Sequence, residues 1–252
     1  MNYLIGDIGN TNIKICKLNN RFKITNIYLF HTKSRNLNKN LNRKFKLILN
    51  KNVSKNIVFS SVVPKVFYTI SKILKKKKYK VFEIKNFNLK KLMKFKIKNF
   101  SQLGSDRIAN SIAVSNKFNS NCIVIDFGTA TTFDIVMKNN IYAGGVIAPG
   151  IKLSIQNLFS STALLPLFKF NKYPNNFGKN TLEAMSAGFF WGYEGLINNI
   201  LKKITKKNGS NSKIVLTGGY AYLFKNRLSR KTMIQNNITI EGIIKIYKYF
   251  IK

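Results

Sequence analysis

The sequence predicts an α/β protein built from two similar halves. Its 252 residues, of which 45% are hydrophobic, suffice for one large domain or two modest domains with buried cores. Apolar strand patterns alternate with helical spacing along the chain. A strand–turn–strand unit that carries Asp-x-Gly occurs first at Asp7 and again 119 residues later at Asp126. This internal repeat is the strongest sign of a duplicated fold.

The first half should contain a sheet and three helices. Short apolar runs predict strands over residues 1–10, 11–18, 21–30, 56–64 and 79–84. Helical spacing predicts helices over residues 37–50 and 66–78, and a further helix after residue 104.

The second half repeats this opening. Strand patterns cover residues 121–137, 141–150 and 212–219, and Asn139 and Asn140 are typical of a hairpin turn. Helices are expected after Pro149, over 181–204 and over 238–250. No linker rich in Pro, Gly or Ser divides the chain, so the repeat itself sets the expected boundary. We therefore expect an N-terminal domain over 1–115 and a C-terminal domain over 116–252.

The net charge of +36 would ordinarily indicate nucleic acid or an anionic membrane surface as a partner. The kind of basic residue argues otherwise, because 38 of the 44 are lysine and only 6 are arginine. Arginine is the residue that bidentate phosphate and base recognition prefers. We therefore interpret the excess as compositional drift, with lysine runs on solvated surfaces, and do not expect nucleic acid as a partner.

The cysteines and the apolar runs predict a cytoplasmic protein. Cys16 and Cys122 each lie inside an apolar run, which predicts buried free thiols and a reducing compartment. The N-terminus lacks the pattern of an export signal, and no apolar run approaches the about 20 residues that a membrane span requires. We expect no association with a membrane.

Carboxylates are scarce in this chain, which draws attention to each of them. The eight are Asp7, Glu83, Asp106, Asp126, Asp134, Glu183, Glu194 and Glu241. Asp7 and Asp126 both end a buried strand and are followed two residues later by glycine. Such a loop can bind phosphate through amide and hydroxyl donors while the carboxylate orients a hydrated cation. A single Asp-x-Gly is more often a tight turn, but two copies in matching strand contexts favour a nucleotide site.

A third group of residues precedes the helix after residue 104. In Gly104-Ser105-Asp106-Arg107, the aspartate is suited to cap the helix, which is the structural interpretation. The functional interpretation is that Asp106, beside Arg107, takes a proton from a hydroxyl group while the arginine holds an anionic substrate. The residues alone leave both interpretations open.

These motifs together resemble the type III pantothenate kinases, a branch of the actin, sugar kinase and heat-shock chaperone ATPase superfamily. The resemblance covers essentially the whole chain, in the motifs DIGNTNIK, SSVVP, GSDRIANS, DFGTATTFD, AGGVIAPGI, TALLP, GKNTLEAMSAG, LTGG and ITIEGI. It implies two ribonuclease H-like (actin-like ATPase) domains with the active site in the cleft and at a homodimer interface. It also implies phosphorylation of pantothenate by ATP to 4'-phosphopantothenate, the first step of coenzyme A biosynthesis.

The resemblance assigns roles to individual residues. The first phosphate loop would bind ATP through Asp7, Ile8, Gly9, Asn10, Thr11, Asn12, Ile13 and Lys14, with Thr129 as a further ATP contact. Asp7 would place Mg²⁺ through ATP, and Asp126 would bind a monovalent cation, K⁺ or NH4⁺. Pantothenate would contact Gly104, Ser105, Asp106, Arg107 and Thr181, and Asp106 would be the general base.

Two positions depart from the family, and two other functions compete. Ile97 and Phe100 stand where the family usually has tyrosine and proline, which could weaken pantothenate binding. One alternative is a kinase for another small hydroxylated substrate, against which the GSDR and GKNT motifs argue. The other is a nucleotide-binding, transcription-accessory protein without kinase turnover. The presence of Asp7, Asp106 and Asp126 together favours the enzyme.

Overall fold

The computed structural model describes residues 1–208 and 211–252, and these residues form two compact units. Unit 1 comprises Met1–Lys117, Asn140–Tyr142 and Asn237–Lys252, and unit 2 comprises Phe118–Asn139 and Ala143–Asn236. The chain passes from unit 1 to unit 2 after Lys117. The C-terminal residues, however, belong to unit 1, so the two units are not two continuous halves of the chain.

Unit 1 is built on a five-stranded sheet of order β3-β2-β1-β4-β5. Its strands are β1 (Asn2–Ile8), β2 (Asn12–Leu18), β3 (Ile24–His31), β4 (Val53–Ser61) and β5 (Lys80–Glu83). The three N-terminal strands form an antiparallel meander, and β4 and β5 then run parallel to β1. Parallel neighbours end at the same edge of a sheet, so β1, β4 and β5 bring Asp7, Ser60 and Glu83 to one edge.

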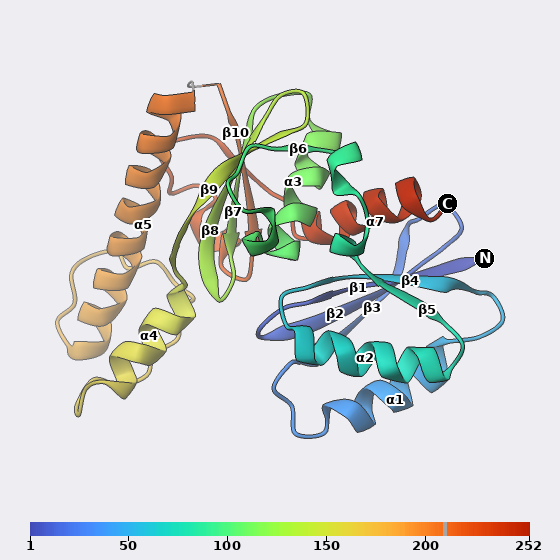
Figure 1. Ribbon diagram of the computed structural model, residues 1–252. Coiled ribbons are helices and arrows are strands. Elements are labelled where there is room, and N and C mark those ends of the chain that lie inside the picture. The colour runs from blue at the N-terminus through green and yellow to red at the C-terminus, as the bar shows by residue number, and fades with distance from the viewer. Residues whose placement is uncertain (209–210) are drawn as a thin grey trace. The chain divides into compact units, whose positions relative to one another are not determined.

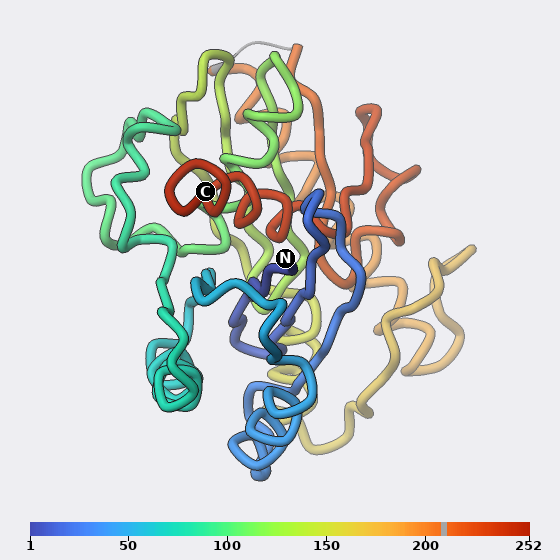
Figure 2. Tube along the Cα trace, turned by 90° about the vertical axis from the view of Figure 1, so that its right-hand side faces the viewer, coloured from blue at the N-terminus to red at the C-terminus, as the bar shows by residue number. Residues whose placement is uncertain are grey.

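Helices cover both faces of this sheet (Figure 1). They are α1 (Leu37–Ile48), α2 (Pro64–Lys76), α3 (Ser105–Lys117) and α7 (Ile238–Phe250). Figure 1 shows α1 and α2 on one face and α3 with α7 on the other. Phe45 of α1 and Leu74 of α2 are buried with Phe59 of β4 in one apolar core. Figure 2 shows the C-terminal α7 beside the start of β1.

A run of short elements leads from β5 to α3 within unit 1. These are η1 (Ile84–Asn86), η2 (Leu89–Lys91), β6 (Lys94–Phe95) and η3 (Phe100–Gln102), of which the three η elements are 3₁₀ helices. Phe100, one of the two residues that depart from the family, packs edge to face on Phe95 with ring centroids 4.7 Å apart. The half-buried Ile97 follows β6. Phe100 is thus a packing residue of this segment.

The sheet of unit 2 repeats the topology of unit 1. Its strands are β7 (Cys122–Phe127), β8 (Ala130–Met137), β9 (Ile141–Pro149), β10 (Lys213–Gly218) and β11 (Thr232–Ile234). Their order β9-β8-β7-β10-β11 corresponds to β3-β2-β1-β4-β5, with β8 antiparallel to β7 and with β10 and β11 parallel to it. Ile141 and Tyr142, the part of β9 that belongs to unit 1, pair with β6. The shared order confirms the predicted duplication.

The described residues of unit 2 also form the helices α4 (Ile151–Ser160), α5 (Thr181–Asn208) and α6 (Ala221–Phe224). Ile155 of α4, Phe190 and Ile197 of α5 and Phe224 of α6 are buried together with Ile125 of β7. Among the residues that the structure describes, no helix is both long and apolar enough to cross a bilayer.

Candidate active site

Asp7 lies near the end of β1, immediately before the first phosphate loop. It is half-buried and pairs with Lys14 of β2 on one side and with Ser60 of β4 on the other. The loop is closed by the Gly9 amide, which donates to the Asn12 carbonyl at 2.9 Å. Asn10, Thr11 and Asn12 are exposed, so the loop offers amide and hydroxyl donors to a ligand.

Thr32 holds this loop from outside. Its hydroxyl donates to the Gly9 carbonyl at 2.7 Å, and its amide donates to the Thr11 carbonyl at 2.9 Å. Gly6 is required on the preceding strand, because a Cβ there would lie 2.4 Å from the Phe59 ring. Hydrogen bonds from Thr32 and the close packing at Gly6 therefore fix the turn that presents Asp7.

The motif Gly104 to Arg107 forms the start of α3, also in unit 1. Ser105 is buried and begins the helix, and Asp106 lies in its first turn with Oδ1 accepting from the Arg107 amide at 2.7 Å. The Asp106 carboxylate folds back over Gly104, where a Cβ would stand 2.5 Å from Oδ1. Glycine is needed at 104 because any side chain would displace this carboxylate. Asp106 thus caps the helix start and remains half-buried beside Asp7, so the two interpretations are compatible.

Asp7 and Asp106, both in unit 1, ionise less readily than free carboxyl groups. Burial, followed by the negative charge of Asp106, raises the pKa of Asp7 to about 6, although Ser60 and Lys14 act in the opposite direction. Burial also raises the pKa of Asp106, against the lowering effects of the Arg107 amide and guanidinium and of Lys85. A carboxylate with a raised pKa is a better proton acceptor, which suits a general base.

Unit 2 carries the second Asp-x-Gly loop, and two glycines from other elements shape it. Asp126 is the last residue but one of β7, as Asp7 is of β1, and a Cβ on Gly218 of β10 would lie 2.7 Å from the Asp126 Oδ1. Gly218 also has a positive φ of 88°, which favours glycine. A Cβ on Gly150 would lie 1.9 Å from the Thr129 carbonyl, so the start of α4 packs directly on this loop. The motifs LTGG and AGGVIAPGI therefore have a packing role around Asp126 and Thr129.

Thr181 is the first residue of α5 and is exposed. The preceding Asn180 accepts from the Glu183 amide at 3.0 Å, and Glu183 in turn accepts from the Lys179 amide at 2.9 Å. The Asn180 side chain thus caps the helix, and the Glu183 side chain holds the residue before the cap, which accounts for most of the GKNTLE motif. Thr181 is presented by this cap at the surface of unit 2.

The donor set of unit 1 fits a magnesium ion that arrives with a nucleotide. No group of three or more His, Cys, Asp or Glu side chains gathers within residues 1–208 and 211–252. Magnesium is usually held by one or two carboxylates together with substrate phosphates, and the desolvated Asp7 beside Asp106 offers such a place. A cation there would relieve the repulsion between the two acids.

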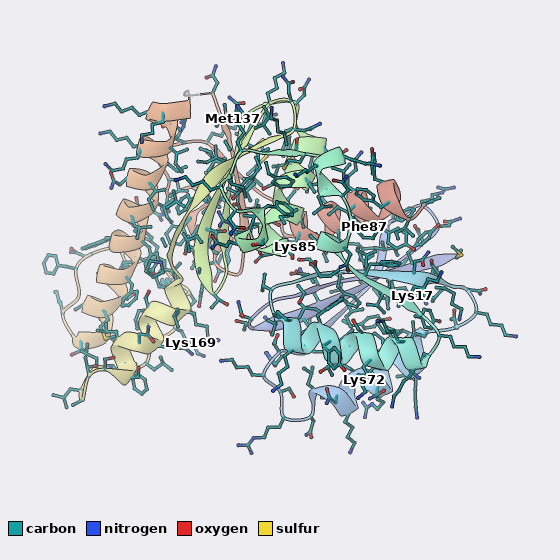
Figure 3. The ribbon with its side chains drawn as sticks, viewed as in Figure 1. Lys17, Lys72, Lys85, Phe87, Met137 and Lys169 are labelled. Carbon is teal, nitrogen blue, oxygen red and sulfur yellow. The ribbon has the colours of Figure 1, made fainter. Side chains whose placement is uncertain are left out.

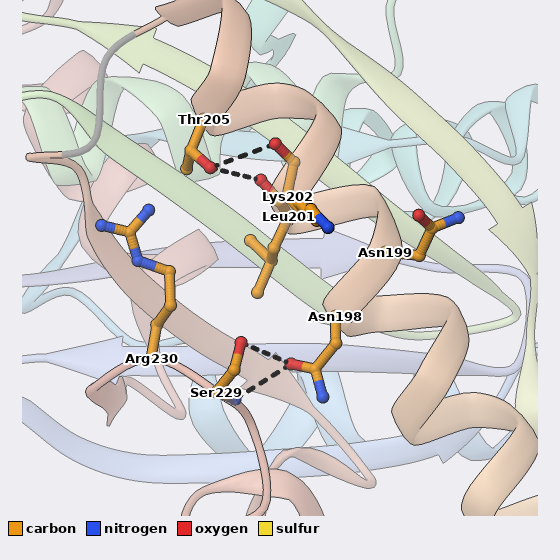
Figure 4. A pocket seen from close by; sticks show the side chains of 7 residues that line it. All are labelled: Asn198, Asn199, Leu201, Lys202, Thr205, Ser229 and Arg230. Atoms are coloured by element: carbon orange, nitrogen blue, oxygen red, sulfur yellow. Dashed lines mark hydrogen bonds between the residues drawn. The ribbon is translucent and has the colours of Figure 1, made fainter.

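One hollow of about 400 Å³ lies elsewhere, against the C-terminal half of α5 (Figure 4). The loop that follows α6 closes it, and the Asn198 side chain accepts from the Ser229 amide at 2.9 Å and from its hydroxyl at 3.0 Å. It contains none of the predicted site residues, so it does not bear on the candidate active site.

Sequence reasoning assigned no role to Glu83 and Lys85, which the structure places beside Ser105 and Asp106. Lys85 is labelled in Figure 3. The scarcity of carboxylates could have singled out Glu83, but Lys85 is indistinguishable from the other lysines by sequence.

Comparisons with known proteins agree with this description. A family model described as Type III pantothenate kinase matches residues 3–203. The Type III pantothenate kinase of Pelagibacter ubique is 46% identical over 250 residues, which cover 96% of this chain and 97% of that protein. That of Koribacter versatilis is 38% identical over 196 residues, which cover 76% of this chain and 70% of that protein.

Two solved structures share the fold at low identity. One is a Campylobacter jejuni protein described as a Baf family transcriptional activator, with a TM-score of 0.62, 21% identity and 98% of each chain covered. The other is the activator of 2-hydroxyisocaproyl-CoA dehydratase from Clostridium difficile with bound ADPNP, with a TM-score of 0.54, 11% identity and coverage of 99% and 94%. On the match over residues 3–203 and the near full-length identity of 46%, the chain belongs to the type III pantothenate kinase family.

Proposed function

We propose that this chain transfers the γ-phosphoryl group of ATP to the primary hydroxyl of pantothenate and so forms 4'-phosphopantothenate, the first step of coenzyme A biosynthesis. The hydroxyl oxygen attacks the γ-phosphorus, the bond from that phosphorus to the leaving ADP oxygen breaks, and the hydroxyl proton passes to Asp106. The observation that carries this proposal is the half-buried Asp106 carboxylate, folded over Gly104 beside Asp7.

The other residues supply binding and charge stabilisation. In this proposal Asp7 and the loop through Lys14 hold Mg-ATP, Thr129 contacts ATP, and Asp126 holds K⁺ or NH4⁺. Gly104, Ser105, Arg107 and Thr181 bind pantothenate. The exposed donors of residues 10–12 and the desolvated Asp7 support the nucleotide part. Phosphoryl transfer depends on positioning and electrostatics, so loops, cations and one base suffice.

We also propose that the enzyme is a cytoplasmic homodimer, as the family resemblance implies. Large apolar side chains on unit 2 support a partner surface, because Leu164, Leu167, Phe177 and Trp191 are 92%, 56%, 68% and 43% exposed. Light scattering after size exclusion should give twice the chain mass, and Leu164→Asp should shift the mass toward one chain. Buried free thiols at Cys16 and Cys122 support a reducing compartment.

The decisive experiment is a coupled assay of ADP release with and without pantothenate, in potassium and then in sodium. We expect release that requires pantothenate and is faster in potassium. Asp106→Asn should retain ATP binding but lose about 10²- to 10⁴-fold in kcat, the usual contribution of a general base. Unchanged turnover in Asp106→Asn would contradict its role as the base, and ADP release independent of pantothenate would contradict the substrate.

A further inference from the structure

Glu83 joins three segments of unit 1 that are distant in sequence. It is the last residue of β5 and is half-buried. One carboxylate oxygen accepts from the Ser61 amide at the end of β4 (3.3 Å), and the other accepts from the Lys85 amide (2.7 Å). Burial raises the pKa of Glu83, and the side chain of Ser105, the first residue of α3, lies close enough to act against that shift.

Two of these contacts lie next to the candidate catalytic groups. Ser105 immediately precedes Asp106, and its side chain is buried. Ser61 immediately follows Ser60, which pairs with Asp7 across the sheet. The Glu83 carboxylate therefore connects the strand beside Asp7 to the helix turn that carries Asp106.

Glu83 also caps the 3₁₀ helix η1, and a purely local role has to be weighed. In that cap the Lys85 amide donates to Glu83, and the Glu83 amide donates to the Asn86 side chain at 2.7 Å. The cap accounts for these two bonds only. It does not account for the hydrogen bond from Ser61 or for the proximity of Ser105, which lie 22 residues to either side of Glu83.

Lys85 adds charge to the same place. Its ammonium group donates to the Ser101 carbonyl at 3.0 Å, in the segment that leads into Gly104, and its positive charge acts on both Glu83 and Asp106. The segment before α3 is thus held by Lys85 and the first residue of α3 by Glu83. These contacts also fix the position of Asp106, because only Gly104 and Ser105 separate it from the segment before α3.

We propose that Glu83 is a positioning residue for phosphoryl transfer, which fixes the first turn of α3 so that the Asp106 carboxylate stays over Gly104. This inference rests on the proposed function, in which Asp106 is the base. Glu83 acts through Ser105 and does not itself contact the substrate.

The test compares Glu83→Ala and Glu83→Gln with the wild-type enzyme in steady-state kinetics. Glu83→Ala should lower kcat about tenfold to a hundredfold with KM for ATP unchanged, because misplacing a catalytic group by about 1 Å can cost about 10²-fold. Glu83→Gln keeps the shape and one acceptor oxygen, so it should restore part of the loss. If Glu83→Ala does not fold, the kcat of Glu83→Gln still tests the inference. Binding of a non-hydrolysable ATP analogue checks that both variants are folded.

Two controls separate positioning from local capping and from charge. Asn86→Ala removes the other half of the η1 cap and should leave kcat within about twofold of wild type, since an exposed cap contributes only about 1 kcal/mol to stability. Glu241→Gln makes the same charge change at the other end of α3, where Glu241 pairs with Lys117 at 3.1 Å. It too should retain kcat. At saturating pantothenate, the kcat of Glu83→Ala combined with Ser105→Ala should fall no further than that of the worse single variant, because both changes act on kcat through one contact. The pantothenate contact proposed for Ser105 should affect KM instead.

Three outcomes would overturn this inference and leave the proposed function standing. The Glu83 variants could turn over like wild type, Asn86→Ala could lose as much kcat as Glu83→Ala, or the kcat losses of Glu83→Ala and Ser105→Ala could be additive. Absence of pantothenate-dependent ADP release from the wild-type enzyme would overturn the proposed function, and this inference with it. The two failures are therefore distinguishable in the same set of assays.

Discussion

Asp7 is kept in surroundings that oppose its negative charge. Burial and the neighbouring Asp106 raise its pKa from 3.8 to about 6, so the folded protein binds the proton more tightly than the unfolded chain does. A group of this kind contributes stability that is fully present below pH 3.8 and is lost as the pH rises through about 6. At neutral pH the fold therefore carries an ionised Asp7 at a cost, which is common for functional residues.

Removing that charge should stabilise the fold near neutral pH. We expect Asp7→Asn, without nucleotide or metal, to be more stable than wild type at pH 7.5 by about 1–3 kcal/mol. The difference should shrink as the pH falls from about 6 to about 4, because wild-type Asp7 then becomes neutral as well. Thermal melts of both proteins over this range measure it. An equal melting temperature at pH 7.5, or a gap that widens in acid, would contradict the pKa assigned to Asp7.

At the residue scale, the sequence predicts groups that carry their own local signal. Asp7 and Asp126 lie near the ends of apolar strands, two residues before a glycine, and Gly104 and Asp106 lie at the start of a helix, so each is visible in a few neighbouring letters. Glu83 has no such signal, because its partners Ser61 and Ser105 are brought to it only by the parallel pairing of β4 with β5 and by the placement of α3. Roles that depend on distant contacts are invisible until the fold is known.

At the element scale, the contact of α3 with α7 holds the C-terminus in unit 1. Gly242 of α7 lies against the backbone of Ala109 in α3, where an added Cβ would stand 1.9 Å from the Ala109 carbonyl oxygen. The Thr239 hydroxyl donates to the Asn110 side chain at 2.7 Å, and the exposed Lys117–Glu241 pair adds to the contact. Since α3 carries Asp106, the glycine in ITIEGI supports the active site from outside it.

Replacing Gly242 should therefore cost stability. Gly242→Ala should destabilise the protein by about 1–3 kcal/mol, the usual cost of overpacking, as measured by chemical denaturation. The matched control is Gly195→Ala in the exposed interior of α5, where an added Cβ meets nothing within 4 Å. That variant should be stabilised by up to about 1 kcal/mol, because alanine is the better helix former. A Gly242→Ala protein as stable as wild type would show that α3 and α7 can separate freely.

The predictability of an element follows from its length and its local chemistry. The long strands and helices carry clear apolar periodicity, and Asn139 and Asn140 form the expected turn with φ values of 65° and 58°. β6, β11 and α6 have two, three and four residues, too few to establish any period, and the sequence did not predict them. The membership of α7 in unit 1 was also beyond local patterns, because it depends on the contact at Gly242.

At the scale of the whole molecule, the charge of +36 is spread over both units and takes part in packing. Lys44 lies over the ring of Tyr28 at 4.1 Å and Lys55 over Tyr79 at 4.4 Å in unit 1, and Lys213 lies over Phe118 at 4.9 Å in unit 2. Figure 3 labels two other lysines of unit 1, Lys17 of β2 and the exposed Lys72 of α2. The lysines over Tyr28, Tyr79 and Phe118 pack on aromatic rings of the protein itself, which gives them a structural role without a nucleic-acid partner.

The remaining question for the whole molecule is whether this charge attracts the anionic substrates. Screening reduces interactions between exposed charges beyond a Debye length of about 8 Å at physiological salt. We therefore expect kcat/KM to fall by less than about tenfold between about 0.01 and 0.5 M ionic strength at constant potassium, with kcat unchanged.

Duplex DNA provides the comparison in the same buffers. Its binding to the protein should be weak at about 0.15 M salt, with a Kd in the non-specific range of about 10⁻⁴ to 10⁻⁶ M. Nanomolar binding that depends on DNA sequence, together with slow pantothenate turnover, would instead favour the transcription-accessory alternative. Comparing DNA binding with pantothenate turnover at physiological salt decides between the accessory protein and the kinase. The positive charge attracts DNA and the anionic substrates alike, whereas the geometry around Asp106 serves only the kinase.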